Sequence, residues 1–373
     1  MKKFICLVAS TAFIAHAALA QKTIEIKNPL DKDRLELISI PFDQFKKHFN
    51  VDTIFTIKDK SSTKVYAHQL EKLGNAAPQN VLIEIPIESN AVLNLIVSTD
   101  KSPATASKTY ARYVPERFDD FAWENNVVAF RLYGKALEGR KDDAQGMDYW
   151  AKRTENLIIN KWYKGDDYHK DHGEGLDYYS VGQTLGAGDL ALYFNNKIHF
   201  TKHYRTFNVL DNGPLRTTFK LDFESEELAG ETIQLSKTIS IDANQHFNNI
   251  TIQLNNKNKK NTPVVVGLVK RGESNPSFEF DKDDNYLAYW EPEINNSGKT
   301  GTALIFTKEK PSFINNDEKQ FLLKTTIKNN KPFIYYNGAA WDRAGKITSF
   351  DQWDDYVEDF SEKLKKPLKV KLK

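Results

Sequence analysis

Cysteine is almost absent from this sequence of 373 residues, and the single copy, Cys6, lies close to the N-terminus. A chain that loses its first residues on export would carry no thiol. Such a chain has no disulfide, no thiolate metal site and no cysteine nucleophile. Its stability has to come from burial of apolar side chains, which a chain of this length can achieve without covalent links.

Long apolar runs are also missing. The apolar stretch at residues 4–15 follows a short start with two lysines, and it is shorter than the ~20 residues that cross a bilayer. Residues 18–20, Ala-Leu-Ala, supply the small side chains that a signal peptidase requires. We expect residues 1–20 to be a signal peptide that is cleaved near Ala20. This predicts a soluble protein of the periplasm or the exterior, with no membrane span.

An excess of charge of either sign is lacking as well. The chain has 52 basic and 50 acidic residues, and two of the lysines belong to the expected signal peptide, so 50 of each sign remain. This balance argues against bulk attraction to nucleic acid or to an anionic membrane. An anionic ligand would have to meet a local cluster of cations. Aromatic residues make up 12% of the chain, which suits a large β core and also stacking on sugar rings.

What the sequence does contain is a series of short segments typical of β-strands, some of which alternate apolar and polar residues. They are residues 23–27, 81–85, 93–97, 217–223, 250–254, 264–269, 303–306 and 333–336. Helical periodicity is confined to residues 42–49 and to a C-terminal segment with Ser349 as N-cap. Many strands and few helices predict a mostly-β fold, built as a sandwich or a barrel.

The same pattern suggests how the chain is divided. Residues 21–105 are expected to form an amino-terminal β segment packed on the main domain, with residues 98–107 as a linker. Residues 106–373 are expected to form one large β-sandwich that carries the catalytic site. The lysine-rich tail after Lys363 is interpreted as a solvated end or a last edge strand.

Polar and aromatic side chains concentrate between residues 113 and 216. In the expected strand 127–134, alternation places Arg131 and Tyr133 on one face and apolar side chains on the other. If segment 146–153 is extended, Trp150 and Lys152 share a face. Each of these faces could be a solvated sheet surface or a place for a ligand, and the spacing alone does not decide between them.

The glycine-rich stretch 162–188 contains His169 and His172, three residues apart. Glycines prevent a stable helix here, and polar loops held by a rigid sheet often carry function. Three interpretations stay open: a divalent metal bound with Glu174, acid–base catalysis, or hydrogen bonds that only shape the loop. The metal interpretation is the weaker one because the His-Glu-x-x-His motif is absent, so we expect no metal and no other cofactor. A second polar cluster lies at residues 202–205.

Several of these segments together resemble a known family. The segments are 114–117 (VPER), 120–125 (DFAWEN), 129–134 (AFRLYG), 148–153 (DYWAKR), 168–175 (YHKDHGEG), 181–188 (VGxxLGAG) and 336–341 (YxGAAW). In this order they resemble secreted bacterial proteins labelled as a domain of unknown function, which include the ulvan oligosaccharide dehydratase. The resemblance covers nearly the whole mature chain, and Asn126 departs from it where an aspartate is expected.

The resemblance implies a fold and a reaction. The fold would be a large β-sandwich of the galactose-mutarotase-like kind. The substrate would be an acidic oligosaccharide with glucuronic or iduronic acid at its non-reducing end, linked to sulfated rhamnose. The enzyme would remove water across C4–C5 of that end residue and leave a 4,5-unsaturated uronic acid.

Such a reaction needs a cation to neutralise the carboxylate, a base for the C5 proton and an acid for the departing O4. We expect Arg131, or Lys152 with Arg153, to hold the carboxylate. The expected bases are His169 or His172, and the expected acids are Tyr178 or Tyr204. The expected substrate contacts are Trp123, Glu124, Asn125, Trp150, Lys152, Arg153, Glu174, His203 and Arg205. The alternatives are a polysaccharide lyase acting by β-elimination, a sugar epimerase, and a non-catalytic carbohydrate-binding protein.

Overall fold

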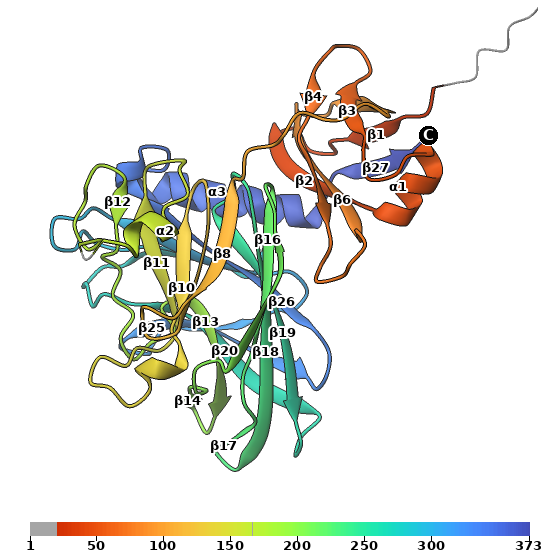
Figure 1. Cartoon of the computed structure of the whole chain (residues 1–373). Helices are drawn as coiled ribbons and strands as arrows, with labels where there is room; N and C mark the ends of the chain where they lie inside the picture. Colours follow the sequence, from red (N-terminus) through yellow and green to blue (C-terminus); the bar gives the residue numbers. More distant parts are fainter. Residues whose placement is uncertain (1–20, 166) are drawn as a thin grey trace, which may run out of the picture.

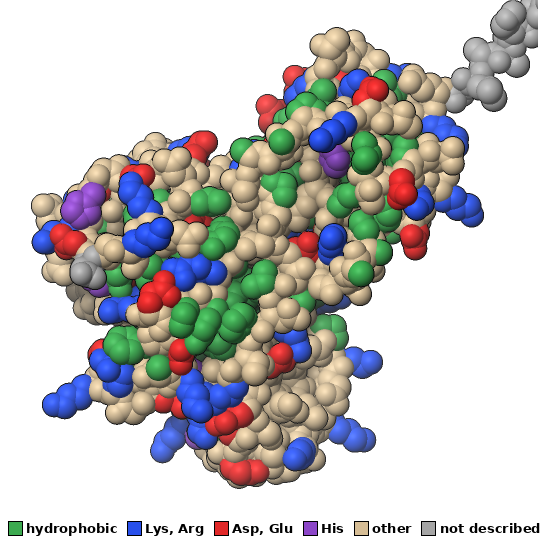
Figure 2. Space-filling view, viewed as in Figure 1, with side chains coloured by type: hydrophobic (Ala, Val, Ile, Leu, Met, Phe, Trp, Pro, Cys, Tyr) green, Lys and Arg blue, Asp and Glu red, His purple; other side chains and the backbone are tan. Residues whose placement is uncertain are grey.

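The computed structural model describes residues 21–165 and 167–373, which fold into a smaller and a larger β-rich module (Figure 1). The expected signal peptide and its cleavage point near Ala20 lie outside the described residues. Among the residues that are described, no helix is long and apolar enough to cross a membrane. On the face shown in Figure 2, basic and acidic side chains are interspersed, as the neutral composition predicts.

The smaller module combines the first strands of the chain with the last one. Its elements are β1 Ile24–Lys27, β2 Arg34–Pro41, α1 Phe42–Phe49, β3 Thr56–Asp59, β4 Val65–Tyr66, β5 His68–Glu71, β6 Asn80–Ile87, β7 Val92–Ser98 and β27 Lys369–Leu372. One sheet has the strand order β27-β1-β7-β3-β4 and the other β2-β6-β5. Their apolar faces and α1 share one core, in which Phe45, Ile57 and Leu95 are fully buried.

The larger module is a sandwich whose first layer is one nine-stranded sheet in the order β15-β16-β18-β19-β26-β23-β22-β21, with β17 beside β18. Its strands are β15 Thr206–Asn212, β16 Arg216–Asp222, β17 Glu226–Leu228, β18 Glu231–Asp242, β19 Phe247–Asn256, β21 Ser277–Asp281, β22 Tyr286–Trp290, β23 Thr300–Phe306 and β26 Phe333–Trp341. All of their pairings are antiparallel, so hairpin turns suffice to connect most neighbours.

The second layer consists of two five-stranded sheets, joined by a bridge between Met147 and Gly186. The first, in the order β12-β11-β10-β9-β8, contains β8 Thr109–Val114, β9 Asp120–Asn125, β10 Ala129–Leu132, β11 Met147–Lys152 and β12 Gly175–Leu176. The second, in the order β14-β13-β20-β25-β24, contains β13 Ala187–Phe194, β14 Lys197–His199, β20 Asn261–Val269, β24 Ser312–Ile314 and β25 Gln320–Lys328. Alternate side chains of all three sheets meet in one core, because successive residues of a strand point to opposite faces.

The outer faces of the sandwich are covered unequally. The helices of this module are η1 Lys135–Leu137, α2 Ile159–Trp162, η2 Asp342–Ala344 and α3 Phe350–Lys365. Helix α3 packs Trp353 and Val357 on the nine-stranded sheet, and α2 covers the sheet that contains β10. The Ser349 hydroxyl accepts a hydrogen bond from the Gln352 N–H and caps α3, as predicted. The mostly-β prediction, with a large sandwich, an amino-terminal β segment and few helices, is confirmed.

The structure changes one part of the predicted division of the chain. Strand β27 leaves the sandwich and pairs with β1 at the edge of the smaller module, so residues 106–373 are not one unit (Figure 1). Two backbone hydrogen bonds of 2.8 and 2.9 Å join Thr23 and Lys373. The tail is therefore an edge strand of the sheet that the first strand of the chain also enters.

Deleting residues 368–373 should weaken the smaller module selectively. Leu368, Val370 and Leu372 pack against its core, and their loss should cost on the order of 3 kcal/mol. We expect faster amide hydrogen exchange in β1. All six tryptophans lie outside residues 21–105, so tryptophan fluorescence should report an unchanged unfolding midpoint for the sandwich. The exposed Lys371→Ala serves as control, and full protection of β1 in the truncated chain would contradict this role of β27.

Candidate functional site

The antiparallel register of β9, β10 and β11 gathers charged side chains on the outer face of one sheet. Arg131 lies opposite Asp148, and Ala129 lies opposite both Glu124 and Trp150. The segment that follows β11, including α2, then lies across this face. As a result, charges that an open sheet would show to water are buried.

Lys152 and Glu124 form a fully buried ion pair, with 2.8 Å between Nζ and Oε2. The Lys152 ammonium also donates to the Asn125 carbonyl oxygen at 2.7 Å. The Glu124 carboxylate accepts from the N–H groups of Ile158 and Ile159 at 2.9 and 2.8 Å, at the start of α2. Burial lowers the pKa of Lys152, and the nearby Glu124 opposes that shift. The pair ties the covering segment to the sheet, and the expectation that Lys152 clamps a substrate carboxylate is wrong because its ammonium is enclosed and satisfied.

Arg131 is surrounded by three carboxyl groups. Its Nε donates to Asp148 at 2.9 Å, and its Nη2 contacts Asp148 and also Asp177, the latter at 3.2 Å. Its Nη1 is 3.4 Å from Asp120. All four side chains are buried, with exposed fractions of 7% or less. One guanidinium does not neutralise three carboxylates, which favours protonation of some of them.

Two carboxyl groups of this cluster hold protons more tightly than usual. Burial raises the pKa of Asp120 to about 7, against the opposing effect of Arg131. Burial, with the charge of Asp148 next in size, raises the pKa of Asp177 well above its ordinary value. When Asp120 and Asp177 are both protonated, the charges of Asp148 and Arg131 cancel. The cluster then holds two carboxyl protons and has no net negative charge.

A cavity of about 590 Å³ opens beside this cluster and is lined by Arg131, Asp177, His169 and Tyr178. The His169 Nδ1 lies 2.9 Å from the Asp177 carbonyl oxygen and 3.7 Å from its Oδ2. Because a carbonyl oxygen only accepts, Nδ1 must carry the hydrogen and Nε2 the lone pair. The sequence-based candidates Arg131, His169 and Tyr178 thus share one hollow.

Other predicted residues lie next to that hollow. His172 and Glu174 line a smaller hollow of about 210 Å³. There, His172 Nε2 lies 3.2 Å from the Asp167 carbonyl oxygen. Arg153 pairs with Asp171 at 2.5 Å, and its guanidinium lies 5.4 Å from the Trp341 ring centroid. These contacts shape the loop rather than the cavity wall.

His169 and His172 therefore line different hollows, which does not favour a shared metal ion. Over residues 21–165 and 167–373, no group of three or more histidine, cysteine or acidic side chains is arranged to hold one.

Four predicted site residues are enclosed in packed structure, so two predictions need correction: that Trp123, Asn125 and Trp150 contact a substrate, and that Tyr204 acts as the acid. Trp123 is fully buried and donates to Asn248 at 2.8 Å, and Tyr204 donates to the Asp119 carbonyl oxygen. Asn125 uses its whole side chain on backbone groups of the adjoining turns. Trp150 is 1% exposed and lies between Trp162, Tyr168 and Arg131. Burial leaves these side chains no surface for a sugar.

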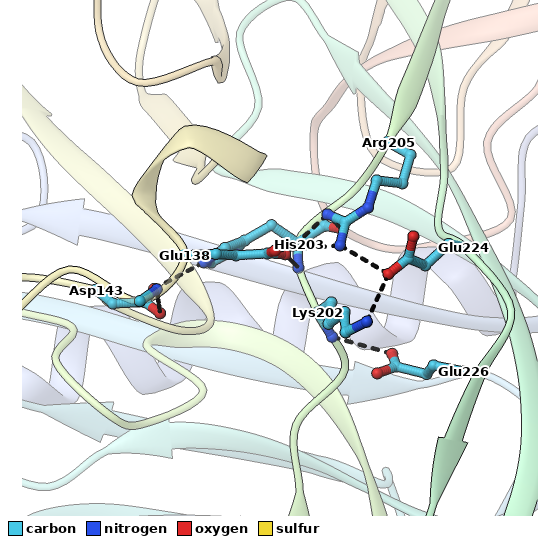
Figure 3. A network of polar contacts seen from close by, with 8 residues as sticks. Glu138, Asp143, Lys202, His203, Arg205, Glu224 and Glu226 are labelled. Carbon is cyan, nitrogen blue, oxygen red and sulfur yellow. Dashed lines mark hydrogen bonds and ion pairs between the residues drawn. The ribbon is translucent and has the colours of Figure 1, made fainter.

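Figure 3 shows that His203 and Arg205 belong to a polar network instead. The His203 Nε2 lies 2.9 Å from Asp143 Oδ1, and the Arg205 guanidinium donates to Glu138 at 2.8 and 3.1 Å. Asp143 lines the 590 Å³ cavity. His203 and Arg205 thus hold the loop that forms one wall, and they act on the cavity only through that loop.

Sequence reasoning missed the carboxyl groups of Asp120, Asp148 and Asp177 as a cluster. Alternation alone places Asp148 on the same face as Trp150 and Lys152, but the strand register that brings it to Arg131 has no local signal. Asp177 comes from a loop 46 residues after Arg131. Only the folded chain brings these groups together.

Residues 26–370 match the model of a family described as a domain of unknown function, DUF4861. The chain belongs to the DUF4861 family. It is 30% identical over 399 residues to a protein of Formosa agariphila named "Uncharacterized protein P7", and the alignment covers all of this chain and 98% of that relative.

The DUF4861 chain also resembles solved structures of carbohydrate enzymes in its fold. A glycosyl hydrolase family 38 protein from Enterococcus faecalis matches with a TM-score of 0.52 and 9% identity, over 94% of this chain. The match covers 47% of that structure, so this chain spans about half of its length. An alpha-mannosidase from Enterococcus faecalis V583 matches with a TM-score of 0.46. At such low identity, the first of these likenesses shows the β-sandwich fold alone.

Replacing Glu124 by Gln should destabilise the protein by about 3–5 kcal/mol, because it leaves the Lys152 ammonium buried without its counter-charge. The free energy of unfolding in urea measures this loss. The matched double variant, Glu124→Gln with Lys152→Met, should recover much of it because no buried charge is left. If the double variant is as unstable as the single one, the ion pair is not what holds the covering segment.

Stability should depend on pH through Asp120. In the unfolded chain this carboxyl ionises near its ordinary pKa of about 3.9, whereas in the folded protein it keeps its proton up to a pKa of about 7. The folded state binds more protons in this interval, so Asp120 lowers stability as the pH rises through it. Asp120→Asn cannot titrate and should gain stability relative to the parent from about pH 4 to about pH 7. Urea unfolding across this range measures the difference, and the exposed Asp283→Asn should show none.

Proposed function

We propose that this DUF4861 protein is a carbohydrate dehydratase that removes water across C4–C5 of a glucuronic or iduronic acid at the non-reducing end of an acidic oligosaccharide. The observation that carries the proposal is the position of His169, anchored through Nδ1 at the rim of a cavity whose wall contains Arg131 and the proton-holding carboxyl group of Asp177. The motif resemblance to the ulvan oligosaccharide dehydratase supports ulvan-type oligosaccharides as the substrate class.

The proton at C5 is only weakly acidic because the adjacent carboxylate already carries a negative charge. A cation beside that carboxylate is therefore the first requirement. Arg131 lines the cavity, but its guanidinium is already paired with Asp148. Lys141 lines the cavity as well and makes no ion pair with any described residue. We place the uronate carboxylate at Lys141, with the Arg131 cluster beside it. An ionised Asp177 would oppose this by about 4 kcal/mol for charges 4 Å apart near a surface, so its raised pKa favours substrate binding.

His169 then accepts the C5 proton on Nε2. The electron pair of the C5–H bond forms the C4–C5 double bond, and the C4–O4 bond breaks. The departing oxygen takes a proton and leaves as water. Tyr178 lines the same cavity and carries a hydroxyl proton at neutral pH, so we assign it the role of this acid.

A polysaccharide lyase would remove the same proton, but a sugar would leave in place of water. A carbohydrate-binding protein would leave the ligand unchanged. The products therefore separate the three classes. A dehydratase lowers the mass of the oligosaccharide by one water and adds the ultraviolet absorbance of a conjugated unsaturated acid, whereas a lyase shortens the chain.

His169→Ala should lower turnover about a hundredfold to ten-thousandfold, as expected for loss of a general base. Mass spectrometry and ultraviolet absorbance on saturated uronate-ended ulvan oligosaccharides measure the product. The matched control is His172→Ala, which removes an exposed histidine of the neighbouring hollow and should retain most of the activity. The reverse result would transfer the role of base to His172. No product with the parent protein would remove the dehydratase proposal altogether.

A further inference from the structure

The sheet β14-β13-β20-β25-β24 has an outer face that is not covered by any helix of residues 21–165 and 167–373. Its inner side chains, such as Leu192 and Val266, belong to the central core. On the outer side, Ala191, Val265 and Leu322 form a small buried floor. Leu322 of this floor lines a groove of about 870 Å³.

The groove has aromatic and basic side chains above its floor. Tyr193 and Phe200 are half-buried on it, and Lys197, Lys319 and Lys324 line it. Against these three lysines the lining contains one acid, Asp317, which gives a formal excess of two positive charges. Within residues 21–165 and 167–373, none of the three lysines has an ion-pair partner. An excess of unpaired cations on a neutral protein marks a local site for an anion.

One of the cations is held in place, and the loop that precedes another is anchored. The register puts Lys324 opposite Val265 and Ser312, and its ammonium lies 5.0 Å from the centroid of the Tyr193 ring. This contact fixes the charge without neutralising it. Lys319 follows a loop whose carbonyl oxygens at Asn315 and Asp317 accept hydrogen bonds from Lys270 at 2.9 and 3.0 Å.

The groove also adjoins the 590 Å³ cavity, because Gln183 lines both. The Gln183 amide donates to the Asp143 carbonyl oxygen at 2.6 Å, so the residue at this junction is anchored. A linear ligand with its end in the cavity can therefore continue past Gln183 into the groove. Aromatic rings with amide side chains suit the apolar faces and hydroxyls of sugars, and the lysines suit regularly spaced acidic groups.

We propose that this groove binds the internal part of an anionic polysaccharide chain through Lys197, Lys319 and Lys324. The position of the chain end in the cavity rests on the proposed function, whereas binding in the groove does not. Sulfate and carboxylate groups both carry the required charge, and the choice of probes separates them.

The test compares the parent protein with Lys197→Gln/Lys319→Gln/Lys324→Gln in equilibrium binding to dextran sulfate, polygalacturonate and neutral dextran. We expect the parent to bind at least one of the two anionic polymers and to bind neutral dextran far more weakly. The triple variant should bind about tenfold more weakly, with a smaller dependence on salt. Lys47→Gln/Lys101→Gln/Lys282→Gln removes three exposed lysines elsewhere and should bind like the parent.

Three outcomes would overturn the proposal: equal binding by the groove variant and the parent, equal loss in the control variant, or equally tight binding of single-stranded DNA. Catalysis gives an independent readout. The groove variant should raise KM for long oligosaccharides with kcat unchanged, and leave a disaccharide unaffected. His169→Ala should keep the polymer affinity, so a failure of the dehydratase proposal would leave the binding result intact.

Discussion

The architecture of the candidate site depends on one constraint: charges buried under the segment that follows β11 must be compensated. An unpaired buried ion costs several kcal/mol, far more than the few contacts of a short helix supply. Glu124 meets this requirement for Lys152 and for the first N–H groups of α2, and Asp148 meets it for Arg131. Glu124 thus joins the sheet to α2, and the contact of Arg131 with Asp177 joins it to the loop whose carbonyl oxygen anchors His169, so the wall of the cavity and the position of His169 follow from these contacts.

Much of the fold could be predicted from local pattern. Local pattern located several strands of both modules, among them β1, β6, β16 and β26, and Ser349 with its helical spacing located α3, because these signals arise within a few neighbouring residues. Helix α2 was not predicted, because it has four residues and no periodicity. The carboxylate that accepts hydrogen bonds at its start, Glu124, comes from a distant strand. The pairing of β27 with β1 was not predicted for a related reason: the two strands are more than 300 residues apart, and neither strand has a local sequence pattern that indicates its partner.

The site was predictable in its residue types but less so in their roles. Arg131, His169 and Tyr178 do line one cavity, since arginine, histidine and tyrosine in glycine-rich surroundings are favoured at ligand sites. Lys152 and Trp150 carried the same signal and turned out to be enclosed. A strand pattern says which side chains share a face, but it does not say whether another segment covers that face. In this protein the segment after β11 covers the face, and its sequence predicts only a polar loop.

Strand β27 has a consequence for the order in which the molecule can form. It is translated after the whole sandwich, yet it completes the sheet that contains β1, which is translated before the sandwich. The sandwich between them can close without β27, whereas the earlier strands keep an unpaired edge until β27 has been made. Domains usually fold in the order of their translation. In this protein the smaller module is begun before the sandwich and completed after it, so a chain interrupted before β27 leaves that module incomplete.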